Sequence, residues 1–263
     1  TLFPYTTLFR SPYSLTRERT SMSQPTVNVE TRGSVAIVTI DRPDSSNTLN
    51  VQVGMDLLAA AITCGRNSAV RAVVLTGAGK HFCFGGDLRS MQAKGAGVEA
   101  YIRELTGYLH AAISQFVRMD APVIAAVNGT AAGGGVGFVA MADLAIAGEG
   151  AKFNLAYTAA GLVPDCSTTF FLPRVLGAKR TLELMLTNRT LTAREALEWG
   201  LVNQVVPDAN VLPEALKLAE KLAGGALRSF GKTKRLLAHS LPGLESQMVL
   251  YMEIGRASCR ERV

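Results

Sequence analysis

Cysteine is scarce in this chain, and its spacing excludes two kinds of site. Among 263 residues there are four cysteines, Cys64, Cys83, Cys166 and Cys259. None forms the C-x-x-C spacing that zinc sites and thiol–disulfide motifs use, so neither a metal centre nor a disulfide framework is expected. Chains without disulfides are typical of reducing compartments. We therefore expect a cytoplasmic protein that binds no metal.

Aromatic residues and clusters of basic residues are also sparse. Aromatics make up 6% of the chain, with one tryptophan, and no segment combines them with a run of lysine and arginine. Such a combination is typical of nucleic-acid binding, which is therefore not expected. The formal net charge of +6 falls to +4 when residues 1–11 and 253–263, each contributing +1, are set aside. A mildly basic surface suits a substrate that carries phosphate.

No long apolar run is uninterrupted. The most hydrophobic stretch, residues 123–147, contains Asn128, Asp143 and five glycines, and it alternates strand-like with turn-like pieces. A membrane-spanning helix needs about 20 predominantly apolar residues, so this stretch is interpreted as part of a buried core. We expect no membrane association.

The two ends of the chain do not resemble a folded domain. Residues 1–11 and 253–263 resemble the translation of a DNA sequencing adapter and of its reverse complement, so we leave both out of the fold prediction. Residues 12–21 are polar and patternless, which makes Met22 the expected natural start; the alternative is a pair of natural disordered tails. We expect a disordered tail over 1–21, one domain over 22–252 whose helical part from about 200 is truncated, and a second tail over 253–263.

Glycine, by contrast, is abundant and concentrated in two clusters, His81–Leu88 and Asn128–Gly137. Each follows a run that predicts a buried strand, Val70–Thr76 or Pro122–Val127, and each leads into a segment that can be helical. Glycine at a strand-to-helix turn lets backbone N–H groups approach a ligand that a β-carbon would block. Two such turns directed at one point form an oxyanion hole, which stabilises negative charge on a carbonyl oxygen.

The remaining segments alternate between strand and helix patterns, which indicates an α/β fold. Strands are predicted at Val27–Thr31, Val35–Ile40, Asp143–Ala147, Lys152–Leu155 and Val202–Val206, and helices at Asn50–Arg66 and Val98–Met119. The first two strands form a hairpin that turns at residues 32–34. From Thr168 onward the chain is predicted to be mostly helical, with one strand, Val202–Val206.

Several motifs occur in the order and spacing of a known family. They are Asp41-Arg42-Pro43 with Asn47, Phe82–Leu88, Pro122–Gly135, Asp143–Ala147, Phe171–Gly177 and Ala196–Val202. On these motifs the chain resembles the crotonase, or enoyl-CoA hydratase/isomerase, superfamily over about residues 26–240. The resemblance implies an α/β spiral of ββα turns, the ClpP/crotonase type, with a helical C-terminal region. It also implies a homotrimer or dimer of trimers if the C-terminus is complete, and we expect weakened assembly or an open pocket in the truncated chain.

The resemblance further implies a substrate and a binding site. Family members act on acyl-CoA thioesters, and coenzyme A is part of the substrate rather than a permanently bound cofactor. The backbone N–H groups that hold the thioester enolate oxygen would be those of Gly86 and Gly134. The path of the coenzyme A adenine and phosphates would be lined by Ser45, Ser46, Phe84, Gly86, Asp87 and Leu88.

Two glutamates that position and activate water in family hydratases are absent. Their places are taken by Gly137 and Tyr157, which argues against hydration by that pair. Asp165 lies eight residues after Tyr157, where relatives that shift double bonds carry a catalytic aspartate. A carboxylate there could take a proton from one carbon and return it to another. The alternative is that Asp165 only N-caps a helix that begins near Cys166.

His110 is a second candidate for catalysis. In the 4-chlorobenzoyl-CoA dehalogenase branch, positions matching Asp165 and His110 carry the nucleophile and the base. Against this, Tyr157 replaces the tryptophan that orients the nucleophile, and Leu109 and Gly86 stand where that branch has bulky rings. The alternative for His110 is a packing residue on an apolar helix face. Tyr157 could hydrogen-bond Asp165 or the acyl group, or be a core tyrosine whose hydroxyl is satisfied.

Three functions follow as hypotheses from these residues. The expected one is enoyl-CoA double-bond isomerisation with Asp165 as base. One alternative is a hydrolytic aryl-CoA dehalogenase that uses Asp165 and His110, and another is a CoA-thioester-binding protein that kept the oxyanion hole without efficient chemistry. Both catalytic hypotheses predict that Asp165, His110 and Tyr157 converge above Gly86 and Gly134.

Overall fold

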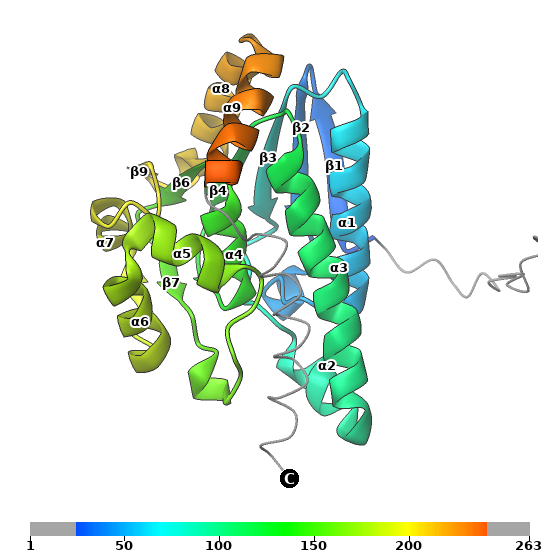
Figure 1. The fold of residues 1–263 in the computed structure, drawn as a ribbon, viewed down its shortest axis with the longest axis vertical. Coiled ribbons are helices and arrows are strands. Elements are labelled where there is room, and N and C mark those ends of the chain that lie inside the picture. The colour runs from blue at the N-terminus through cyan, green and yellow to red at the C-terminus, as the bar shows by residue number, and fades with distance from the viewer. Residues whose placement is uncertain (1–24, 241–263) are drawn as a thin grey trace, which may run out of the picture.

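The computed structural model describes residues 25–240, which form two β-sheets flanked by helices (Figure 1). The larger sheet has six strands in the order β1-β2-β3-β4-β6-β9. Their bounds are β1 Val27–Arg32, β2 Val35–Ile40, β3 Ala72–Gly77, β4 Val123–Val127, β6 Leu144–Gly148 and β9 Gln204–Val206. β1 and β2 are antiparallel, whereas each later pair of neighbours is parallel. A smaller sheet contains β5 Ala131–Ala132, β7 Lys152–Asn154 and β8 Leu191–Thr192.

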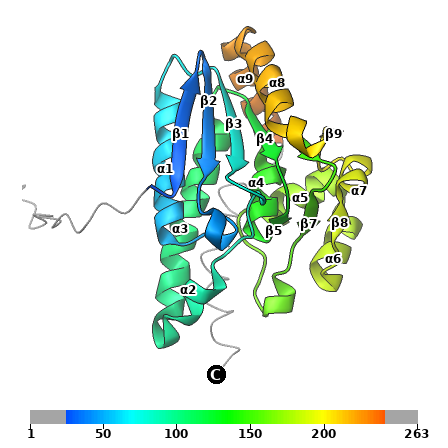
Figure 2. The same cartoon turned by 180° about the vertical axis from the view of Figure 1, so that it is seen from behind.

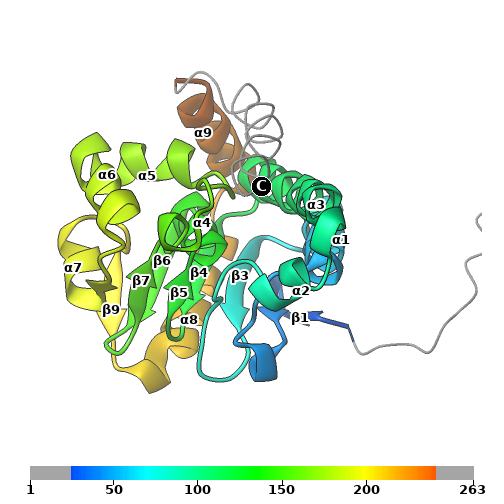
Figure 3. The same cartoon turned by 90° about the horizontal axis from the view of Figure 1, so that it is seen from below.

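The central strands of the larger sheet are covered on both faces, as is usual for parallel strands. All six residues of β3 and all five of β4 are buried. One face of the sheet packs on α1 (Val51–Arg66) and α3 (Val98–Arg118), and the other packs on α8 (Val211–Ala223). Figure 3 shows these helices on opposite sides of the sheet. The parallel strands therefore direct their carboxyl ends, and the glycine clusters that follow β3 and β4, to one edge.

Short helices follow the two glycine clusters. α2 (Leu88–Gln92) follows the first, and α4 (Gly134–Met141) follows the second. All eight residues of α4 are buried, so this helix lies inside the molecule between the sheet and the helices around it. α2 packs at one end of α3, at the bottom of Figure 1. The site is thus built on two short helices that the core holds in place.

The C-terminal half adds a helical lobe beside the smaller sheet, on the left of Figure 1. It contains α5 (Thr168–Leu176), α6 (Ala178–Thr187) and α7 (Ala193–Glu198). α9 (Leu227–Ser240) packs along α3, next to α8, as both Figure 1 and Figure 2 show. Four short 3₁₀ helices complete the described elements: η1 Pro43–Ser45, η2 Gly95–Gly97, η3 Thr158–Ala160 and η4 Asp208–Asn210.

The structure places most predicted elements within one or two residues and corrects two predictions. The helix expected near Cys166 begins at Thr168, and its N-cap is Ser167, so the prediction that Asp165 caps this helix is wrong. β8 is a second strand in the region that was predicted to hold one. The predicted adapter-like ends, 1–21 and 253–263, and the last part of the predicted helical region, 241–252, lie outside the described residues.

Candidate active site

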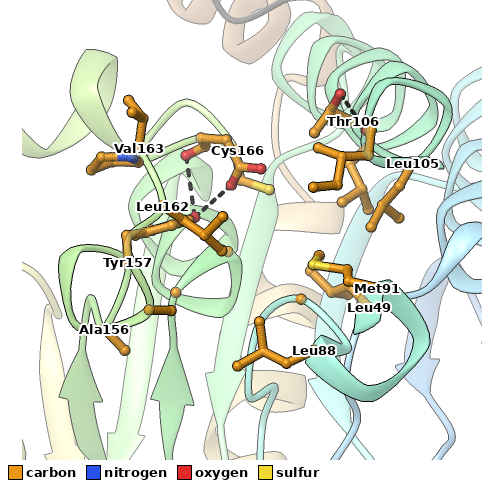
Figure 4. A pocket seen from close by; sticks show the side chains of 18 of the residues that line it. Leu49, Leu88, Met91, Leu105, Thr106, Ala156, Tyr157, Leu162, Val163 and Cys166 are labelled. Atoms are coloured by element: carbon orange, nitrogen blue, oxygen red, sulfur yellow. Dashed lines mark hydrogen bonds between the residues drawn. The ribbon is translucent and has the colours of Figure 1, made fainter. Parts of the chain in front are cut away.

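A pocket opens at the edge of the sheet where the glycine clusters lie (Figure 4). Tyr157, Leu162 and Val163 lie on one side of it, and Leu105, Thr106 and Met91 lie on the other. Its wall is largely apolar. The residues that line it are Leu49, Phe84, Gly86, Leu88, Met91, Ile102, Leu105, Thr106, Leu109, Gly133, Gly134, Leu155, Ala156, Tyr157, Ala160, Leu162, Val163, Pro164, Asp165 and Cys166.

The two glycine turns touch each other through their backbones at the base of this pocket. The Ala132 N–H donates to the Cys83 carbonyl at 2.8 Å, which joins the two clusters. Gly85 and Gly133 have φ of +75° and +50°, in the left-handed region that glycine tolerates best. A β-carbon on Gly85 would lie 2.8 Å from the Ala132 carbonyl oxygen. Glycine is therefore required at this contact for both conformation and space.

The N–H groups of Gly86 and Gly134 are among the backbone donors of the pocket wall that have no acceptor within residues 25–240. Gly86 is held from both sides, because Leu49 N–H donates to the Gly85 carbonyl at 2.7 Å and Asp87 N–H donates to the Leu49 carbonyl at 2.9 Å. Gly134 is the first residue of α4, where the positive end of the helix dipole lies. Unpaired amide donors of this kind are suited to an anionic oxygen.

A tyrosine–carboxylate pair faces the pocket. The Tyr157 hydroxyl donates to the Asp165 carboxylate at 2.6 Å, and both residues line the cavity. Burial, together with the charge of Asp165, raises the pKa of Tyr157 well above its ordinary value, so the phenol stays protonated and remains a donor. The same two causes raise the pKa of the adjacent Cys166 thiol. Asp165 is therefore surrounded by neutral groups, one of which is a strong hydrogen-bond donor.

His110 occupies a different position from the other two predicted side chains. It lies on α3 and is 5% exposed, and it does not line the pocket, although its neighbour Leu109 does. Burial lowers the pKa of His110, and the negative charge of Asp165 only partly opposes this effect. The imidazole is therefore neutral at physiological pH. The structure brings Asp165 and Tyr157 together at the pocket but leaves His110 out of its lining, so the predicted convergence of the three side chains is confirmed for the first two alone.

The predicted coenzyme A contacts divide into two groups. Phe84, Gly86 and Leu88 line the pocket, whereas Ser45, Ser46 and Asp87 do not. The carbonyl of Ser46 accepts from the Phe84 N–H at 3.2 Å. A coenzyme A path along the remaining three residues, outside this pocket wall, stays a prediction.

Asp87 instead has a structural role that is visible in its contacts. Its carboxylate accepts from the Ser90 N–H at 3.1 Å, which caps α2, and it pairs with Arg42 at 3.2 Å. The Arg42 guanidinium also donates to the Thr48 carbonyl at 2.6 Å. The ion pair thus ties the Asp41-Arg42-Pro43 segment to the turn that carries Gly86.

The apolar wall that α3 contributes to the pocket was not predicted from the sequence. It consists of Ile102, Leu105, Thr106 and Leu109. Their spacing of three, four and seven residues is that of one helix face, a signal that the sequence contains but that equally predicts ordinary core packing. The Thr106 hydroxyl donates to the Ile102 carbonyl at 2.8 Å, so its polar atom is engaged within the helix. This wall offers a hydrocarbon surface to a ligand.

Two further findings concern the described part of the chain. Within residues 25–240, no group of three or more His, Cys, Asp or Glu side chains is arranged to hold a metal ion. In the same range, no helix combines the length and the apolar character needed to cross a membrane.

Comparison with known proteins agrees with the fold. Residues 30–256 match the enoyl-CoA hydratase/isomerase family. A 4-chlorobenzoyl coenzyme A dehalogenase-2 from Arthrobacter sp is 36% identical over 228 residues, which cover 86% of this chain and 83% of that protein. The 1,2-epoxyphenylacetyl-CoA isomerase of Escherichia coli is 34% identical over 204 residues, covering 77% of this chain and 78% of the relative.

A solved structure gives the same result in three dimensions. The crystal structure of a monofunctional enoyl CoA isomerase from M. smegmatis superposes with a TM-score of 0.71 at 33% identity, covering 83% of this chain and 94% of that one. The predicted α/β fold of the crotonase type is confirmed. The chain belongs to the enoyl-CoA hydratase/isomerase family, whose members act on CoA thioesters.

Proposed function

We propose that this protein moves the double bond of an enoyl-CoA thioester and that Asp165 is the base. The observation that carries the proposal is the Asp165 carboxylate at the pocket wall, held by the Tyr157 hydroxyl at 2.6 Å, in the same cavity as the unpaired Gly86 and Gly134 N–H groups. A base and an oxyanion hole facing one cavity are what proton abstraction next to a thioester carbonyl requires.

The reaction uses the two N–H groups throughout and Asp165 twice. The thioester oxygen accepts hydrogen bonds from the Gly86 and Gly134 N–H groups. Asp165 removes a proton from one carbon of the acyl chain, the electrons move into the carbonyl to form an enolate, and Asp165 returns the proton to another carbon as the enolate collapses. No atom is gained or lost. Loss of one oxyanion donor typically costs on the order of 10²–10³ in rate, so the two glycines supply a large part of the acceleration.

Tyr157 and the apolar wall supply the environment for this transfer. The phenol orients the carboxylate before the first proton transfer, and Asp165 carries the proton between the two transfers. The hydrocarbon wall from α3 accommodates the acyl chain and limits water near the enolate. A shifted double bond, rather than a hydrated product, is the expected outcome of that arrangement.

A second candidate function is hydrolytic dehalogenation of an aryl-CoA. It is favoured by the 36% identity to the Arthrobacter protein named as a dehalogenase. Asp165 would attack the ring carbon, halide would leave, and water activated by His110 would hydrolyse the aryl ester and regenerate the carboxylate. His110 is buried and does not line the pocket, which does not favour that second step. Binding of a CoA thioester without turnover is the third hypothesis.

The test is an assay of the purified protein with 3-enoyl-CoA, 2-enoyl-CoA and 4-chlorobenzoyl-CoA. We expect isomerisation that falls about 10²–10⁴-fold in Asp165→Asn, the range for loss of a general base, and that is retained in His110→Gln. Halide release that is lost in both variants would instead establish the dehalogenase. Tight binding of CoA thioesters without any turnover would establish the binding protein.

A further inference from the structure

We propose that Gly137 is a positioning residue for Asp165: because it lacks a side chain, the segment that carries the carboxylate can rest directly on α4. This inference rests on the proposed function. Gly137 lies one turn after Gly134 on the same helix, and both are buried. One short helix therefore supplies an oxyanion donor and also the surface that sets the position of the base.

The contact between Gly137 and the segment is made by backbone atoms. A β-carbon on Gly137 would overlap the Cys166 carbonyl oxygen and would lie 3.0 Å from the Cys166 β-carbon and 3.3 Å from its carbonyl carbon. At Gly134, a β-carbon would lie 2.9 Å from the Cys166 sulfur. Backbone cannot rotate away as a flexible side chain can. Any side chain at position 137 must therefore displace Cys166 as a whole.

The segment has little freedom to yield without moving Asp165. Cys166 and Ser167 have φ of 49° and 60°, so two successive non-glycine residues hold a left-handed conformation that costs energy. The Asp165 carbonyl accepts from the Thr168 N–H at 3.0 Å and from the Thr168 hydroxyl at 2.7 Å. Because Cys166 follows Asp165 directly, a shift that relieves a clash at Cys166 is transmitted to the carboxylate.

This contact has a consequence for the chemistry that the pocket can support. Position 137 is where the resemblance predicts a water-activating glutamate in hydratases, and here the Cys166 backbone fills the space of any such side chain. A carboxylate at position 137 and a carboxylate on the segment at Asp165 thus exclude each other in this chain. Asp165 can therefore act as the base in this chain because position 137 has no side chain.

The first experiment compares Gly137→Ala with Gly107→Ala. Gly107 is also a helical glycine, but a β-carbon there would meet no atom within 4 Å. A misplacement of about 1 Å costs on the order of 10² in rate, so we expect kcat for isomerisation to fall by about that factor in Gly137→Ala and to stay unchanged in Gly107→Ala. Binding of a saturated acyl-CoA should change less than about threefold, because the oxyanion donors stay in place.

A double-variant cycle separates positioning from general damage. If Gly137 acts through Asp165, then Gly137→Ala should cost little when it is added to Asp165→Asn. Losses that multiply in the double variant would overturn the proposal. Gly137→Glu should gain no hydration of 2-enoyl-CoA; hydration gained with isomerisation intact would also overturn it.

Labelling of Cys166 tests the packing on Gly137 independently of catalytic activity. Cys166 is 1% exposed, so its thiol should react slowly with a maleimide, as followed by peptide mass spectrometry. We expect faster labelling of Cys166 in Gly137→Ala than in the natural protein or in Gly107→Ala. Faster labelling without isomerase activity in any form would refute the function and support the positioning. Unchanged labelling and unchanged kcat would refute the positioning alone.

If Gly137→Ala does not fold, Thr168→Val provides the second variant. It keeps the shape of the side chain and removes the hydroxyl that holds the Asp165 carbonyl. We expect kcat to fall about tenfold, the scale of one lost hydrogen bond, and to show the same lack of additivity with Asp165→Asn. Full activity in Thr168→Val would contradict the idea that the segment must be held.

Discussion

Replacing Tyr157 with phenylalanine removes one oxygen atom and with it the 2.6 Å hydrogen bond to the Asp165 carboxylate. The ring is 8% exposed and keeps its packing in the variant. A hydrogen bond to a charged group contributes about 1.5–3 kcal/mol, and the lower end applies because Asp165 is only half-buried. Because about 1.4 kcal/mol corresponds to a factor of ten in rate, the loss is worth about tenfold.

The expected result is a slower isomerisation. The phenol holds the Asp165 carboxylate at the pocket wall, and the variant leaves the carboxylate without this donor. We expect kcat of Tyr157→Phe to fall about tenfold relative to the natural protein, while binding of a saturated acyl-CoA changes little, because the oxyanion donors stay in place. The assay is initial-rate kinetics with saturating 3-enoyl-CoA.

Tyr101→Phe is the matched control. Its hydroxyl is buried without a hydrogen-bond partner among the described residues, and Tyr101 does not line the pocket. This variant should leave kcat unchanged. A kcat of Tyr157→Phe equal to that of the natural protein would refute the role assigned to the phenol.

Two ion pairs give further predictions. Burial alone would raise the pKa of Asp87, but hydrogen bonds from Ser90 and Arg42 hold the pKa below its ordinary value. Asp87 therefore stabilises the folded protein fully above the ordinary carboxyl pKa, and this stabilisation is lost as the pH falls through the lower pKa of the folded state. Thermal unfolding of Asp87→Asn should therefore depend less on acid than that of the natural protein, and equal slopes would contradict this. Lys234 pairs with Asp143 at 2.6 Å, and Lys234→Met should lower the free energy of unfolding by about 1 kcal/mol, because it removes the cation from a carboxylate that solvent partly reaches. Partial burial raises the pKa of Asp143 in the folded protein, so this carboxyl favours the folded state more as the pH falls through that pKa. Asp143 then loses its charge, and the destabilisation caused by Lys234→Met should shrink over the same range. A destabilisation that is equal at every pH would refute this account.

Elements near the site could be predicted from local patterns. α1 begins at Val51, after Asn50 caps it by accepting from the Val53 N–H at 3.0 Å, and the predicted range started at that cap. The strand predicted from Val70 to Thr76 is observed as β3, Ala72–Gly77. Hydrophobic runs, caps and glycines are properties of neighbouring residues, so the sequence displays them directly.

The surroundings of Asp165 could not be predicted in that way. Proline before aspartate suggested an N-cap, but Cys166 and Ser167 adopt left-handed conformations that delay the start of α5 to Thr168. Non-glycine residues rarely take this conformation, and local propensity argues against it. The Cys166 backbone packs on α4, about thirty residues earlier in the chain. The absence of His110 from the pocket lining likewise depends on how α3 packs against its neighbours.

The sequence by itself determined where the backbone carries no side chain. Glycine at positions 85, 86, 133 and 134 permits two turns to meet and two N–H groups to face a ligand. Only the tertiary structure decided which ionisable group faces them. It pairs Asp165 with Tyr157 at the pocket and leaves His110 out of the lining, because tertiary packing brings together segments that no local pattern connects.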